Sequence, residues 1–128
     1  MKAGYGFGSG GSGGGGGGAN AEAFATGTPQ TLTDGATTNV VVGDTTLHKS
    51  IAVTAYVERG SDSEGSEIDI IINGAGVIDD CGEQFGDVVG LTLASTVVGT
   101  DIVLQCTLTS TGTDATIYFS MVRTLISP

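Results

Sequence analysis

Residues 89–125 read VGLTLASTVVGTDIVLQCTLTSTGTDATIYFSMVRTL, and this stretch decides the fold. Apolar side chains alternate with polar ones through three segments, 89–97, 101–109 and 115–125, which short turns separate. A period of two places successive side chains on opposite faces of a β-strand. The stretch therefore predicts three antiparallel strands in a meander. The side chains expected to point inward include Ile102, Leu104, Cys106, Leu108, Ile117, Phe119 and Met121.

The same alternation occurs earlier in the chain. The further strands that it predicts are 28–33, 39–42, 49–58 and 67–73. Polar residues at 60–66 and acidic residues at 79–83 predict loops. Valine, isoleucine and threonine are abundant, as is typical of strands, and no helical period is present. The sequence thus predicts an all-β fold, an antiparallel β-sandwich or small jelly roll of about seven or eight strands.

The N-terminal end has a different composition. Eleven of its first eighteen residues are glycine, which loses more backbone freedom on ordering than any other residue. We expect a Gly-rich arm at 1–18, a connector at 19–27 and the β-sandwich domain at 28–128. The arm is either a flexible linker or a segment that anchors the domain to a partner. The anchoring residues of the second hypothesis are Tyr5, Phe7, Gly13, Gly14, Gly15, Gly16, Gly17 and Gly18.

Charge excludes two classes of partner. The chain has four basic and fourteen acidic residues, for a net charge of −10. Without a basic patch, we expect no binding to nucleic acid and none to an anionic membrane surface. Glycine-rich sequence follows Lys2 where a signal peptide would be apolar, and no apolar stretch has the length of a membrane span. We therefore expect synthesis and folding in a reducing cytoplasm.

The residues that catalysis or cofactor binding would require are scarce. His48 is the only histidine, so paired-histidine metal sites are excluded, and its place at a strand entry favours a solvated loop residue. Cys106 falls in an alternating strand and is expected to be a small buried hydrophobe, although one Cys81–Cys106 bridge is left open. We predict no enzyme activity and no cofactor.

Acidic residues gather in the two predicted loops. Carboxylate oxygens beside glycine are ligands that Ca²⁺ accepts, yet neither loop has the EF-hand series, and solvated loops are the favoured interpretation. A carboxylate pair for glycoside hydrolysis is disfavoured because nothing sets its separation. The calcium candidates are Asp62, Glu64, Asp79, Asp80 and Glu83.

Apolar residues on the predicted outward faces of the last strands indicate a second buried surface. Val103, Tyr118 and Val122 are the apolar anchors of this surface, and Tyr118 and Val122 have no core role if Phe119 and Met121 point inward. We expect these three side chains to lie in a subunit interface.

Three short patterns carry a resemblance to a known class of protein. They are TPQTLTDGATT at 28–38, AYVER at 55–59, and ATIYF at 115–119 followed by Val122 and Arg123. From Thr28 to Arg123 the chain resembles small virion β-domains of tailed phages, including head-fibre, capsid-decoration and tail-fibre modules. The resemblance implies a structural, homotrimeric virion component made in the host cytoplasm, with no catalytic residue.

Three functional hypotheses follow. The first is a non-enzymatic virion protein of a tailed phage that contacts other virion proteins through its Gly-rich arm. The second is a fibre module that binds a host receptor or glycan, for which Tyr56 and Phe85 are the exposed aromatic candidates. The third is a cell-surface filament or adhesin subunit, which the missing signal peptide disfavours.

Overall fold

The computed structural model describes residues 22–74 and 76–126, and these residues form nine β-strands. The strands are β1 (Glu22–Thr26), β2 (Gln30–Leu32), β3 (Thr37–Asp44), β4 (His48–Arg59), β5 (Asp62–Asn73), β6 (Gly76–Gly86), β7 (Leu91–Val98), β8 (Asp101–Leu108) and β9 (Ala115–Leu125). This described part of the chain offers no helix long and apolar enough to cross a bilayer.

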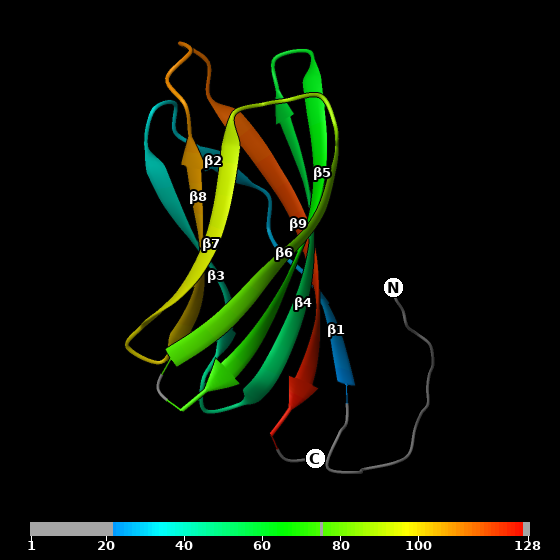
Figure 1. Cartoon of the computed structure of the whole chain (residues 1–128), viewed down its shortest axis with the longest axis vertical. Helices are drawn as coiled ribbons and strands as arrows, with labels where there is room; N and C mark the ends of the chain where they lie inside the picture. Colours follow the sequence, from blue (N-terminus) through cyan, green and yellow to red (C-terminus); the bar gives the residue numbers. More distant parts are fainter. Residues whose placement is uncertain (1–21, 75, 127–128) are drawn as a thin grey trace.

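Two antiparallel sheets make up the fold (Figure 1). Sheet A has the order β1-β9-β4-β5-β6, with β2 also paired to β9, and sheet B has the order β3-β8-β7. Strands β4, β5 and β6 are joined as successive hairpins, and β9 returns from the other sheet to lie beside β4. This is the Greek-key arrangement of many β-sandwiches. The all-β, two-sheet prediction is confirmed, with nine strands in place of about seven or eight.

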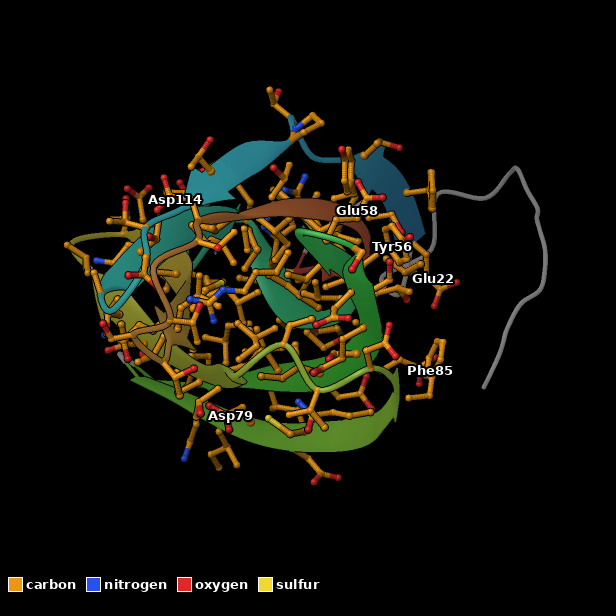
Figure 2. The ribbon with its side chains drawn as sticks, turned by 90° about the horizontal axis from the view of Figure 1, so that it is seen from above. Glu22, Tyr56, Glu58, Asp79, Phe85 and Asp114 are labelled. Carbon is orange, nitrogen blue, oxygen red and sulfur yellow. The ribbon has the colours of Figure 1, made fainter. Side chains whose placement is uncertain are left out.

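One core lies between the sheets, and the ribbon surrounds it when the molecule is seen from above (Figure 2). The faces predicted from alternation in β4, β8 and β9 are confirmed, since all of their inward residues are buried. Phe119 is 5% exposed, and Ile102, Leu104 and Ile117 are fully buried. Burial of this apolar area is the main favourable term in folding.

On one side the sandwich is closed by side chains. The β6 edge of sheet A lies beside the β7 edge of sheet B. Asp79 accepts hydrogen bonds from the backbone N–H (2.9 Å) and the hydroxyl of Ser95. The Cys81 thiol donates to the Leu93 carbonyl, with 3.5 Å between sulfur and oxygen. These bonds hold the two edges together without a strand pairing between them.

The predicted meander is wrong for its last strand. Strands β7 and β8 form a hairpin in sheet B, but β9 crosses to sheet A and pairs with β4, β1 and β2. Alternation gives the same inward and outward pattern in either sheet, so it could not distinguish the two partners.

Both predicted acidic or polar loops, 60–66 and 79–83, are largely strand. The β4–β5 turn takes only Gly60 and Ser61, so β5 begins at Asp62, and 79–83 lies within β6. β6 is an edge strand of sheet A, where charged side chains remain solvated. Charged side chains on an edge strand oppose pairing with a strand of another chain. Residues 22–26 of the predicted connector likewise form β1, at the other edge of the sheet.

Arg59, the last residue of β4, ties together the connections at one end of the sandwich. Its side chain is 6% exposed and forms an ion pair with Asp34 of the β2–β3 turn. Nε donates to the Thr113 carbonyl (2.8 Å), and Nη1 donates to the Val89 carbonyl (2.7 Å). Nη2 also donates to the Thr109 carbonyl (2.7 Å). One guanidinium therefore fixes the β2–β3, β6–β7 and β8–β9 connections.

Asp34 extends this network into the β8–β9 loop. Its Oδ1 accepts hydrogen bonds from the backbone N–H groups of Thr111 (2.8 Å) and Gly112 (3.0 Å). The Thr111 bond, followed by the Gly112 bond and the Arg59 charge, holds the pKa of Asp34 below its ordinary value of 3.8. The ionised form of Asp34 is therefore favoured in the folded protein.

We expect Arg59→Met to lower the free energy of unfolding at pH 7 by about 3 kcal/mol, because the Asp34 carboxylate and three carbonyls lose a buried partner. Arg123→Met is the matched control, since Arg123 donates to the Val42 carbonyl and should cost about 1–2 kcal/mol. Urea melts give both values.

The pH dependence provides a second readout. Because the pKa of Asp34 is lowered by folding, its contribution is present above pH 3.8 and is lost as pH falls through the folded-state pKa. The difference between wild type and Arg59→Met should therefore shrink below about pH 4. Equal losses for the two arginine variants at every pH would contradict the role given to Arg59.

Candidate functional site

Strand register brings three aromatic residues into one line across sheet A. Tyr118 of β9 lies opposite Tyr56 of β4, and Tyr56 lies opposite Gly65 of β5. Gly65 in turn lies opposite Phe85 of β6. Directly paired residues share a face, and Tyr118 alternates with the buried Ile117 and Phe119, so the line runs over the outer face. Tyr118, Tyr56 and Phe85 are called the aromatic row below.

Contacts within the sheet hold the rings of the aromatic row in place. The Tyr56 and Tyr118 centroids are 6.0 Å apart with the ring planes tilted by 41°. The Tyr56 hydroxyl donates to Ser63 Oγ (3.0 Å). Phe85 lies across Gly65, where a Cβ would collide with its ring, so a larger residue at that position would push the ring away from the strand. The rings nevertheless remain 40% (Tyr118), 45% (Tyr56) and 62% (Phe85) exposed.

Glu58 provides a carboxylate beside the two tyrosines. A hydrogen bond to Glu58, followed by the charge of that carboxylate, raises the pKa of Tyr118, so its phenol stays protonated. Figure 2 shows Glu58, Tyr56, Phe85 and Glu22 on one side of the molecule, away from Asp79 and Asp114.

A groove of about 350 Å³ lies next to the aromatic row on the same face. Its floor consists mainly of small side chains of β4 and β9, and β1 and β5 form its walls. Phe24, which is 71% exposed, stands on the β1 side. The polar lining residues are Glu22, Ser50, Thr54, Glu67, Asp69, Ser120 and Thr124.

The row and the groove together offer aromatic rings, carboxylates and hydroxyls on one surface. Sugar rings have apolar C–H faces that pack on aromatic rings, and their hydroxyls donate to carboxylates and exchange hydrogen bonds with serine and threonine. Apolar surface with a few placed polar groups is the usual composition of a small-molecule site. The outer face of sheet A therefore exposes the kinds of chemical group that a carbohydrate contacts.

The calcium candidates do not converge. Glu64 is 6% exposed, so its assignment to a solvated loop was wrong. Asp79 bonds Ser95, Asp62 pairs with Arg59 in the β4–β5 ladder, and Asp80 is exposed. The side chain of Glu83 lies outside the described residues. Within the part of the chain that the structure describes, no three His, Cys, Asp or Glu residues are grouped to hold a metal ion.

The predicted interface residues fall on different surfaces. Tyr118 and Val122 lie on the outer face of sheet A and are 40% and 39% exposed. Val103 belongs to β8 of sheet B and is 3% exposed, because neighbours on β3 and β7 cover it. It offers no exposed apolar anchor. The anchoring residues Tyr5, Phe7 and Gly13–Gly18 lie outside the described residues.

His48 is buried at 7% exposure, so its prediction as a solvated loop residue was wrong. Its Nδ1 accepts a hydrogen bond from the Asp44 backbone N–H (3.1 Å). Burial, followed by the charge of Arg123, lowers the pKa of His48, which keeps the ring neutral at pH 7. The ring is buried beside Gly43 at the entry to β4.

Both cysteines are free thiols, which rules out the bridge left open above. Cys106 is buried as predicted, and burial raises its pKa to about 12. Cys81 is exposed on β6.

Sequence reasoning found Tyr56 and Phe85 as exposed aromatics, but it did not place Tyr118 beside them. It also missed the groove and Phe24 as part of a site. The sequence carried no clear signal for this row, because Gly65, across which Phe85 lies, fell in the predicted loop 60–66 and not in a predicted strand.

No family model matches the sequence, and no curated protein matches it significantly. Among solved structures, the fold is similar to a chain in the crystal structure of the Acinetobacter phage vB_ApiP_P1 tailspike protein, with a TM-score of 0.40 and 10% identity. The match covers 80% of this chain and 22% of that chain, so this chain spans about a fifth of the tailspike chain.

Proposed function

We propose that this chain is a non-enzymatic virion protein of a tailed phage, and that the outer face of sheet A binds a host-surface glycan. The observation that carries the binding role is the aromatic row, in which three exposed rings are held in line across four strands. The virion assignment is supported by the sequence patterns at 28–38, 55–59 and 115–119.

The exposed rings favour a ligand that covers them. Large apolar side chains exposed together on a sheet face usually mark a binding surface. The hydroxyl and carboxylate groups of the adjacent groove favour a ligand rich in hydroxyl groups over a purely apolar one. An oligosaccharide offers both properties along an extended chain.

Glycan binding should depend on the rings of the row. We expect Tyr56→Ala and Phe85→Ala each to weaken binding about tenfold or more, as truncation of a hot-spot residue does. Tyr118→Phe keeps its ring and should bind within about twofold of wild type. Val98→Ala is the control on sheet B, where the side chain is 54% exposed. A glycan array of host-surface sugars, followed by calorimetry on the hits, provides the measurement, and unchanged affinity in both alanine variants would refute the assignment.

The Gly-rich arm is proposed as the attachment to other virion proteins. Deletion of residues 1–18 should leave a folded β-domain with unchanged glycan affinity that no longer enters the particle. Far-UV circular dichroism checks folding, and quantification of the protein in purified particles checks incorporation. Normal incorporation of the truncated chain would show that attachment lies elsewhere.

Contact between copies of this chain is a second candidate function for the same face. It is favoured by Phe24, Val122 and Tyr118, which are exposed together on β1 and β9. Against it stand Glu22, Glu67 and other carboxylates beside these residues, because self-association would bring like charges together.

If the face is an interface, the homotrimer predicted from the sequence resemblance should form through it. Light scattering of the full-length protein should then give about three times the mass of one chain. The Val122→Asp variant should give the mass of a single chain. The same trimer should leave the aromatic row closed to oligosaccharides. A monomer at micromolar concentration that binds glycan would support the first function and reject the second.

A further inference from the structure

A second pocket lies where the aromatic row ends. It has a volume of about 360 Å³ and is formed by the end of β6, the β6–β7 connection and the start of β7. Phe85 belongs both to the row and to the lining of this pocket. The row and the pocket therefore share Phe85 as a common border.

A buried carboxylate lines the pocket. Glu64 of β5 is 6% exposed. Its Oε1 accepts a hydrogen bond from the Val89 backbone N–H (3.3 Å), and its Oε2 accepts one from the Ser66 hydroxyl (3.2 Å). A carboxylate has about four acceptor positions, so Glu64 retains capacity for donors from a ligand.

The remaining lining combines polar and apolar groups. Gln84, Thr92 and Thr109 supply one amide and two hydroxyls, which both donate and accept hydrogen bonds. Val88 and Phe85 are 88% and 62% exposed at the pocket and would be covered by an occupant.

We propose that this pocket binds the terminal sugar residue of the glycan, with Glu64 accepting hydrogen bonds from its hydroxyls and with Phe85 and Val88 packing on its C–H face. This inference rests on the proposed function of the aromatic row. In this proposal the pocket binds the last sugar of the chain, and the aromatic row binds the sugars that precede it. The ligand is therefore a neutral oligosaccharide with a free end.

A neutral sugar fits the pocket better than a cation or an anion. Ca²⁺ takes six to eight oxygen ligands, and the lining offers only two carboxylates, Glu64 and Asp87, each of which already accepts hydrogen bonds from the protein. An anionic sugar would meet both carboxylates as like charges. The hydroxyl groups of a neutral sugar can instead donate hydrogen bonds to the two carboxylates.

The test uses the full chain and named probes. Glucose, galactose and N-acetylglucosamine, together with their unbranched tetramers, are titrated into ¹⁵N-labelled protein, and amide shifts are followed near the pocket (Gly90, Thr92) and near the row (Tyr56, Tyr118). We expect one of the tetramers to shift both groups and its monomer to shift the pocket group alone.

Three variants separate the two surfaces. Glu64→Gln keeps the side-chain size and should weaken both monomer and tetramer about tenfold, because hydrogen bonds to a charged acceptor are the stronger ones. Val88→Ala alters an exposed side chain, so folding is retained, and should weaken both about fivefold. Tyr118→Ala should weaken the tetramer and leave the monomer unchanged.

The outcomes distinguish the two proposals. Tetramer shifts confined to the row, with wild-type affinity in Glu64→Gln and Val88→Ala, would overturn the pocket assignment and leave the proposed function standing. Absence of shifts on both surfaces with every probe would overturn both. Pocket shifts on addition of CaCl₂ but not of sugar would assign the pocket to a cation and reject this inference.

Discussion

The buried Arg59 guanidinium is the interaction on which the arrangement of the outer face of sheet A depends. Arg59 is the last residue of β4, directly before the Gly60–Ser61 turn. Its guanidinium donates a hydrogen bond to the Val89 carbonyl, and Glu64 accepts a hydrogen bond from the backbone N–H of Val89. These bonds fix the register of β4 against β5. A slip of one residue would turn Tyr56 toward the core and Val57 toward solvent. Burial of the apolar face and the short turn already oppose such a slip, and the polar cluster at the end of the sandwich adds to them, so the aromatic row depends on all three.

Alternation predicted the inward faces of β4, β8 and β9 correctly because burial of one face is a local property of a strand. It could not predict which strands pair, so it missed the transfer of β9 to sheet A and with it the neighbourhood of Tyr118 and Tyr56. Polarity misled the interpretation of Glu64 and His48. Both side chains can be buried because each accepts a hydrogen bond from a backbone N–H group. Glu64 accepts one from Val89, which is distant in the sequence, and His48 accepts one from Asp44, on the adjacent turn. Such partners become visible only after the sheets are assembled.

The two outer faces of the sandwich differ in the aromatic side chains that they expose. On sheet B, Val103 is covered by its own neighbours at 3% exposure. On sheet A, rings on three of the strands remain open, and Gly65 leaves room for Phe85 to lie flat. Carboxylates beside these rings keep the surface hydrated and oppose close association of like-charged copies. A neutral, hydroxyl-rich ligand satisfies both the rings and the carboxylates, which a purely apolar partner does not.

The strand register also shows which residues lie at each end of the outer face of sheet A. Glu22, where β1 begins, pairs with Thr124, whereas Glu58 at the Arg59 end pairs with Thr116. At a strand rise of about 3.3 Å per residue, these two positions on β9 are about 26 Å apart. The start of β1 at Glu22, to which the preceding residues are covalently joined, therefore lies at the end of sheet A opposite Glu58 and the β6–β7 connection (Figure 1). An attachment through those residues would hold the pocket away from the particle, which is the orientation that recognition of a free glycan end requires.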